Sequence, residues 1–413
     1  MPLIVLNINF SRRLDPNLRV PESYQFNLGL ERELWRGFVI ESNLTLNRSL
    51  RLWRELNVNA PVLPPGFADF ADYLLSRDFP NLRTASGARP VYNTSLAGDL
   101  VRFTDAPLSS SDTDAVGRLL ESGVPVSVFT LNSFNSTAAL SAALAALAPL
   151  RPDPTRVQVE QLVSAGNSFY RGLTLEARRR RSALPAGFGL SFRAAYTLSS
   201  LVDDGVVNTS SALRAGDFRA ERAPSLLDRR HRLAVSGQLE LPRALPLVGS
   251  LRLAPVLRAA SGAPFNLTLG GDDRNLDDVS NDRPSFDGDL RLLRSRRPGQ
   301  TLDTRLLRVL SLPTIGRHGN LPRNAGRGPA FFKLDLALTR EFRLNERTRL
   351  RPSVEIDNLL NRTVFTFAAE FVNFNALRPN ATAEQRATFE QTFLVPTRTL
   401  RPRGVRLGVR LDF

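Results

Sequence analysis

Oxygen-bearing side chains alternate in one short stretch of the chain, residues 270–284. Asp273, Asn275 and Asp277 stand two positions apart, and oxygen ligands at alternate positions suit Ca²⁺. The stretch differs from a calcium-binding loop, because Asp278 occupies the position of the usual glycine and no glutamate stands at the twelfth position. A solvated acidic loop explains it better. We therefore expect no metal or other cofactor, and keep these three residues only as calcium candidates.

Other residues that could do chemistry are scarce. The chain has no cysteine, which excludes disulfides and thiolate metal sites. Its two histidines, His231 and His318, have no sequence context of a catalytic triad, and no G-x-x-x-x-G-K phosphate loop is present. We expect that the protein is not an enzyme.

Positive charge is the strongest signal in the composition. The net charge is +15, and Lys333 is the only lysine, so arginine carries almost all of it. The arginines are spread along the chain, and a nucleic-acid partner is therefore not expected. One dense run, Arg178–Arg181, follows an apparent strand, and a solvated turn at a membrane edge explains it better than a phosphate-binding patch.

The elements that must position these residues are β-strands. Apolar and polar residues alternate in each of nine segments, and alternation with period two indicates a strand with one apolar and one polar face. Residues 4–10 add the possible tail of a preceding strand, which gives about ten strands in all. The nine segments are residues 23–31, 38–46, 169–178, 188–198, 232–241, 251–258, 332–339, 349–357 and 403–413.

The lengths of the connections indicate how these strands are arranged. Short links at residues 32–37, 179–187, 242–249 and 343–347 alternate with long ones throughout. Outer-membrane barrels have tight periplasmic turns on one side and long outer loops on the other. The sequence therefore predicts an all-β, antiparallel transmembrane barrel in the outer membrane of a Gram-negative-type bacterium, with membrane lipid as a partner. One barrel region would span residues 1–413, and residues 47–156 would form a long irregular extracellular insertion.

A barrel of this kind has a polar interior. The polar positions of the predicted strands are occupied by several charged residues, which we expect to face the lumen, as any barrel interior requires. They are Glu176, Arg178, Arg193, Glu240, Arg252, Arg258 and Glu355.

The amino terminus lacks the pattern of an export signal. Residues 3–6 form a short apolar run without a preceding basic region or a cleavage site made of small residues. We expect the chain to be a fragment, a product of a mis-assigned start, or the downstream half of a split gene.

Several short motifs, taken in order, resemble one family. The chain is similar to the carboxy-terminal barrel half of an Oar-like TonB-dependent receptor. The resemblance covers most of the chain outside residues 61–154. Its motifs are residues 166–170 (GNSFY), 194–199 (AAYTLS), 228–233 (DRRHRL), 261–265 (SGAPF), 281–284 (NDRP), 357–362 (DNLLNR) and the terminal Phe413.

The resemblance implies a barrel of about 22 strands around a plug domain. We expect this chain not to include the plug, and the TonB complex is expected as a partner only if a missing amino-terminal part is present. In such barrels the barrel assembly machinery reads the last strand, a role that the resemblance assigns to Val409, Leu411 and Phe413. The alternatives are a non-transporting surface structural or adhesion barrel and an inactive gene remnant; the substrate is left open.

Overall fold

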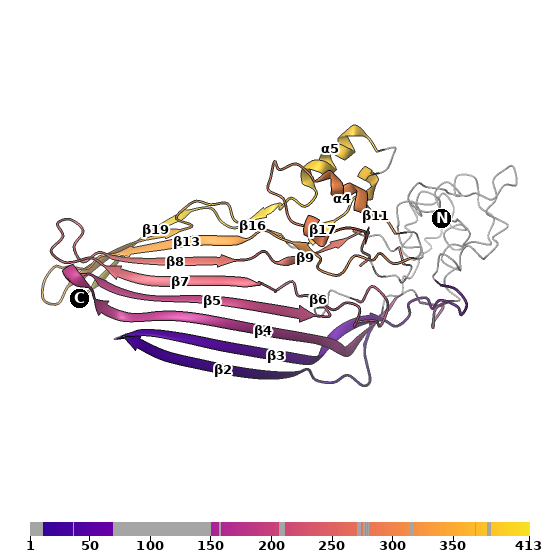
Figure 1. The fold of residues 1–413 in the computed structure, drawn as a ribbon, viewed down its shortest axis with the longest axis horizontal. Coiled ribbons are helices and arrows are strands. Elements are labelled where there is room, and N and C mark those ends of the chain that lie inside the picture. The colour runs from indigo at the N-terminus through magenta and orange to yellow at the C-terminus, as the bar shows by residue number, and fades with distance from the viewer. Residues whose placement is uncertain are drawn as a thin grey trace, which may run out of the picture.

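A computed structural model describes residues 11–35, 37–68, 150–156, 158–205, 211–270, 274–275, 277, 279, 281–313, 317–367, 369–377 and 381–413. Within these residues, nine long strands form one curved sheet (Figure 1). They are β2 (Glu22–Trp35), β3 (Phe38–Asn57), β4 (Val159–Ala183), β5 (Gly189–Asp203), β7 (His231–Glu240), β8 (Arg252–Ala260), β13 (Phe331–Thr339), β15 (Arg349–Asp357) and β19 (Gly404–Asp412).

Each long strand pairs antiparallel with its neighbours in chain order, from β2 to β19. The predicted antiparallel barrel-type sheet is confirmed. One piece breaks the rule, because β1 (Ser11–Leu14) pairs parallel with β4, Ser11 lying opposite Val159. Two short strands, β6 (Ala223–Pro224) and β14 (Phe342–Arg343), extend the sheet at β5 and β15. The possible strand at residues 4–10 lies outside the described residues.

Short and long connections lie at opposite ends of the sheet. The short links lie between β2 and β3, at residues 184–188, at residues 241–251 and at residues 340–348. They are at the end where Figure 1 marks the carboxy terminus. The second contains the 3₁₀ turn η4 (Pro185–Gly187). The predicted turn at residues 179–187 is shorter than expected, because β4 continues through Ala183 and includes the arginine run in its strand.

The predicted insertion, residues 47–156, begins later than expected. β3 continues to Asn57 and pairs with β4 as far as Glu160. Register shifts between Ser49 and Arg54, and a positive φ of 58° at Arg51, break the alternation while the strand pairing resumes beyond them. The pattern was lost because residues 47–49 are all polar and the bulge beyond them changes which face each side chain takes. Residues 69–149 lie outside the described residues.

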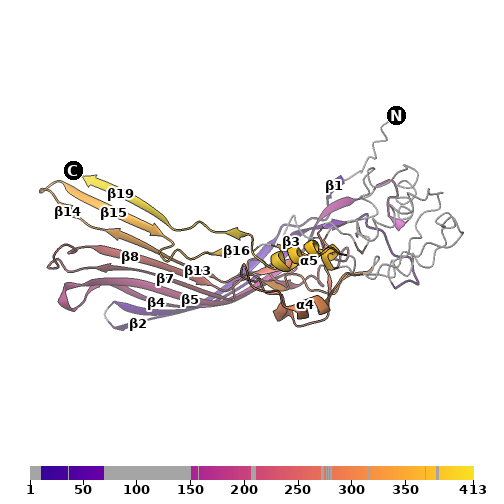
Figure 2. The ribbon, with the colours of Figure 1, turned by 90° about the horizontal axis from the view of Figure 1, so that it is seen from above.

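The two long connections after β8 and β15 enclose a hydrophobic core of their own. β9 pairs with β12 of its own connection and with β17 of the other, so the two connections are joined. Their helices lie beyond the loop end of β15 (Figure 2). We call this unit the loop core. Its elements are β9 (Pro264–Thr268), β10 (Ser285–Phe286), η5 (Leu290–Leu292), α4 (Thr304–Val309), β11 (Leu310–Ser311), β12 (Gly326–Arg327), β16 (Phe365–Thr366), β17 (Ala369–Phe371), η6 (Phe374–Leu377), α5 (Ala383–Thr392) and β18 (Arg398–Thr399).

The interior of the loop core is tightly closed. Phe265, Leu267 and Leu293 are 0% exposed and Leu306 is 1% exposed. The helix α5 is fixed by a capping box, in which Thr382 and Gln385 each accept a backbone hydrogen bond from the other. No helix among the described residues is long and apolar enough to span a membrane.

Truncating Leu306 to alanine should loosen the loop core. The side chain is fully buried, so Leu306→Ala leaves a cavity that costs about 2–5 kcal/mol of the local free energy of unfolding. Limited proteolysis should show faster cleavage in residues 281–313, with no change in the heat-modifiable migration of the barrel. Leu290→Ala is the matched control, because Leu290 is 42% exposed. Equal cleavage of the two variants would contradict the role of the core.

Candidate functional site

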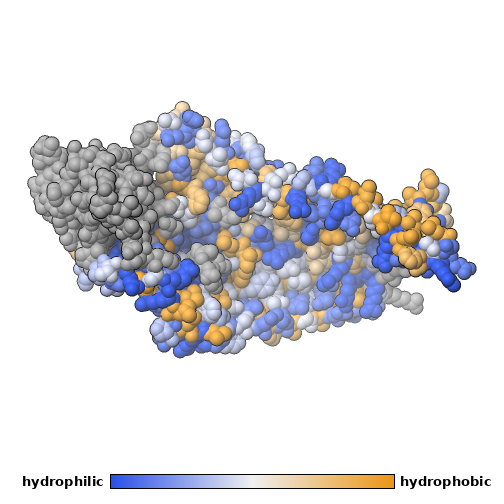
Figure 3. Space-filling view, turned by 180° about the vertical axis from the view of Figure 1, so that it is seen from behind, coloured by the Kyte–Doolittle hydropathy of each residue, from blue (hydrophilic) through white to orange (hydrophobic). Residues whose placement is uncertain are grey.

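The long strands carry apolar side chains on their exposed face. Leu28 and Leu30 of β2 are 61% and 74% exposed, and Leu407 of β19 is 80% exposed. Figure 3 shows hydrophobic residues gathered at the short-turn end and, mixed with hydrophilic ones, along the strands. A water-facing sheet has the opposite arrangement, since apolar surface in water is unfavourable. The exposed face is therefore suited to lipid.

The strand register makes this apolar face continuous. Leu175 lies opposite Tyr196, Tyr196 opposite Leu233, Leu233 opposite Ala259 and Ala259 opposite Phe332. Partners directly across an antiparallel pair point to the same side of a sheet. One apolar row thus crosses five strands.

The opposite face of the sheet holds paired charges. The same register places all seven of the charged residues expected at the lumen on this one face, which we call the charged face. Ion pairs that cross between its strands include Arg178 with Glu31 at 2.5 Å, Arg193 with Glu176 at 2.7 Å, Arg258 with Asp335 at 2.9 Å, Arg252 with Glu240 at 4.0 Å and Arg406 with Glu355 at 3.1 Å.

Two acidic side chains of the charged face are less exposed to solvent than the exposed leucines of the apolar face. Glu176 is 7% exposed. The side chain of Asp335 is 17% exposed and accepts from three donors: Arg258 at 2.9 Å, Lys333 at 2.9 Å and the backbone N–H of Asn358 at 2.8 Å. Sequence reasoning did not single out Asp335 and Lys333 as site residues, although both occupy polar positions of their alternating run.

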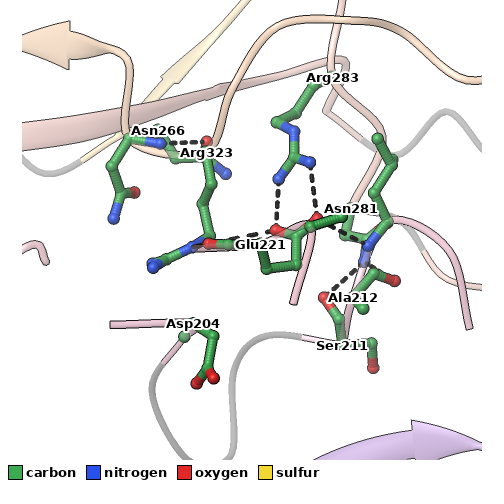
Figure 4. A network of polar contacts seen from close by, with 12 residues as sticks. Asp204, Ser211, Ala212, Glu221, Asn266, Asn281, Arg283 and Arg323 are labelled. Atoms are coloured by element: carbon green, nitrogen blue, oxygen red, sulfur yellow. Dashed lines mark hydrogen bonds and ion pairs between the residues drawn. The ribbon is translucent and has the colours of Figure 1, made fainter. Parts of the chain in front are cut away.

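A second set of charges lies beyond the sheet, where the connections meet (Figure 4). Glu221 accepts two hydrogen bonds from the Arg283 guanidinium, both at 2.7 Å, and its side chain is 3% exposed. Arg323 donates to the Glu221 carbonyl at 2.9 Å and pairs with Asp203 at the end of β5. We call these four residues the loop ion network. It joins β5 to the connections after β5 and β8, and no sequence motif indicated it.

Electrostatics hold Glu221 in its charged form. Burial alone would raise the pKa of the Glu221 carboxyl group. The hydrogen bonds and the charge of Arg283, with smaller contributions from the Leu213 N–H and Arg323, outweigh burial, so the pKa lies below its ordinary value.

The calcium candidates were expected in a solvated loop, and that expectation is wrong for the two that are described. Asn275 and Asp277 are 2% and 7% exposed. Their Oδ1 atoms accept backbone hydrogen bonds from Asp277 and Val279 at 3.1 and 3.0 Å, so these oxygens stabilise the loop itself. Asp273 lies outside the described residues. Within the described ranges, no three acidic, histidine or cysteine side chains are grouped to hold a metal.

The residues expected to guide insertion lie on an outer strand of the described sheet. Val409 and Leu411 of β19 are 74% and 50% exposed, and Phe413 after it is 95% exposed. β19 pairs with β15 along its whole length, from Gly404 opposite Asp357 to Asp412 opposite Arg349. The side chains of Val409 and Leu411 belong to the apolar face.

This fold and polarity define the wall of a membrane-spanning β-barrel. The chain belongs to the outer membrane beta barrel domain family, which matches residues 6–389. It is accordingly a protein of the cell outer membrane.

Comparison with solved structures finds partial similarity. The outer membrane transporter YddB from Escherichia coli aligns with 7% identity and a TM-score of 0.42, over 96% of this chain and 33% of that one. A chain of the FpvAI–pyocin S2 complex aligns with 9% identity and a TM-score of 0.39, over 96% of this chain and 28% of that one. The chain thus spans about a third or less of the length of these two chains. A comparison with curated proteins finds no match.

Adjacent substitutions on β2 should separate the two faces. Leu28 and Asn27 are both exposed, but they point to opposite sides of the strand. We expect Leu28→Arg to destabilise the folded protein in phospholipid vesicles by about 2–4 kcal/mol, because arginine is then placed in lipid. Asn27→Arg, the matched control, should cost much less. Urea unfolding in vesicles measures both, and an equal loss would contradict the assignment of the faces.

The loop ion network should be sensitive to acid. A depressed pKa means that Glu221 contributes stability above its unfolded value of 4.5, and that this contribution is lost as the pH falls below that value. Glu221→Gln should cost about 3–5 kcal/mol of local stability at pH 7, since it leaves Arg283 buried without a carboxylate. The difference in local stability between Glu221→Gln and wild type should shrink as the pH falls toward 3.

Hydrogen–deuterium exchange of residues 211–213, corrected for intrinsic rates, measures this effect. The exposed Glu384→Gln on α5 is the control and should leave the exchange unchanged. A difference between Glu221→Gln and wild type that stays constant from pH 7 to pH 3 would refute the assignment.

Proposed function

We propose that the chain forms the carboxy-terminal part of the barrel wall of an Oar-like TonB-dependent receptor, which transports a solute across the outer membrane. The observation that carries this proposal is an open sheet with lipid-type polarity. In the described part of the chain, β2 pairs only with β3 and β19 pairs only with β15. The wall is therefore incomplete on two sides.

An open edge is costly at membrane depth. The edge strands present backbone N–H and C=O groups without partners, and hydrocarbon offers no water to satisfy them. Further strands must therefore pair with β2 and β19 in the membrane. The resemblance to TonB-dependent receptors supports the proposal that these further strands belong to the same polypeptide.

The charged face supports a filled lumen. The side chains of Arg193 and Arg406 are 68% and 70% exposed, although both are paired with acids of the sheet. Such guanidinium groups retain donors that can bind a domain seated inside the wall. We propose that this domain is a plug, and that the TonB complex acts on the part of the protein that carries it.

The size of the native protein tests the proposal. An antibody against α5 should detect, in outer membranes of the producing bacterium, a heat-modifiable band well above the 45.7 kDa of this chain. Tryptic peptides from that band should include a plug domain. A native band at 45.7 kDa, without plug peptides, would refute a single-chain transporter. Periplasmic fractions and a strain with the gene deleted serve as controls.

A further inference from the structure

A cavity of about 960 Å³ lies where the sheet meets the loop core. Its lining includes Ser200 at β5, His231 at β7, Ser261 after β8 and Phe332 of β13, all at the loop ends of their strands. The other side of the cavity comes from the connections after β8 and β15. We call it the rim cavity.

The rim cavity is rich in arginine. Asp228 is the one carboxylate among the described residues that line it, so positive charge is in large excess. Its six arginines come from three separate connections: Arg230, Arg294, Arg296, Arg297, Arg327 and Arg362.

Two of these arginines are held by the protein. Arg296 donates to the backbone carbonyls of Glu390 and Phe393 at 2.7 and 2.6 Å and is buried. Arg327 lies 3.7 Å from Asp228, which neutralises part of its charge. The side chains of Arg230, Arg294, Arg297 and Arg362 are exposed. The cavity thus combines arginines fixed by the protein with exposed ones.

The cavity adjoins the apolar face of the barrel, not the charged one. Phe332 belongs to the apolar row that runs through Ala259, Leu233 and Tyr196. The guanidinium carbon of Arg362 lies 5.3 Å from the centre of the Phe332 ring. The arginines of the rim cavity therefore lie at the loop-side edge of the lipid-facing surface. Lipid head groups lie at this depth in a membrane.

We propose that the rim cavity binds a phosphate monoester group carried by a lipid of the outer leaflet. Guanidinium groups donate two parallel hydrogen bonds to phosphate, and several arginines line this cavity. The adjoining apolar face would accommodate the acyl chains, which a free phosphate ion does not have. The inference depends on the loops facing outward, as in outer-membrane barrels, and is independent of transport or a plug.

Lipid retention by the native protein tests the site. The protein is purified from outer membranes into a non-ionic detergent and titrated in native mass spectrometry with phosphatidic acid, or with diacylglycerol of the same acyl chains. We expect retention of phosphatidic acid and not of diacylglycerol. Arg294→Gln with Arg297→Gln should weaken retention about tenfold or more, because two charge-assisted contacts are lost.

A matched double variant controls for net charge. Arg305→Gln with Arg308→Gln removes two exposed arginines of α4, neither of which lines the cavity, and should retain phosphatidic acid as wild type does. Heat-modifiable migration of all variants verifies that they fold.

Three results would overturn the proposal. Equal retention of phosphatidic acid by the two double variants would show that the lipid does not bind in the rim cavity. Inorganic phosphate that displaces phosphatidic acid at equal concentration would show that the ligand is free phosphate. Equal retention of phosphatidic acid and diacylglycerol would show that the phosphate group is not recognised.

Discussion

The absence of water in the bilayer core is the constraint on which the other features of this chain depend. Backbone groups cannot be left to solvent there, so each long strand pairs with its neighbours along the sheet. Side chains must then separate by polarity between the two faces. Leucines such as Leu28 and Leu407 lie exposed on one face, while Glu176 and Asp335 are sheltered and ion-paired on the other.

Beyond the ends of the strands water is available again, so apolar side chains are buried there instead of exposed. The loop core buries Phe265, Leu267 and Leu293 completely. Buried charges there have partners: Glu221 is paired with Arg283, and Arg296 donates to backbone carbonyls. A buried charge without a partner costs far more than a surface one. The rim cavity lies at the boundary between these two environments, next to the aromatic ring of Phe332.

The open edges of the sheet connect the fold to the proposed function. A wall with free edges at β2 and β19 is stable in lipid only with additional strands. The exposed guanidinium groups on the charged face then line the interior that these strands would enclose. The proposed plugged transporter barrel would account for both features. The proposed phosphate site on the outer surface would hold the same barrel at the depth of the lipid head groups.

The sequence by itself determined the strands, their order and their two faces, because alternation with period two is a local property that each strand shows alone. It did not reveal the continuation of β3 past Leu46, since residues 47–49 are all polar and a bulge then shifts the alternation without ending the strand pairing. It also missed the loop core and the rim cavity. Their residues are far apart in the chain, as Arg230, Arg294 and Arg362 are, and only tertiary packing brings them together. Contacts between distant segments depend on the shape of the whole fold, which no local pattern encodes.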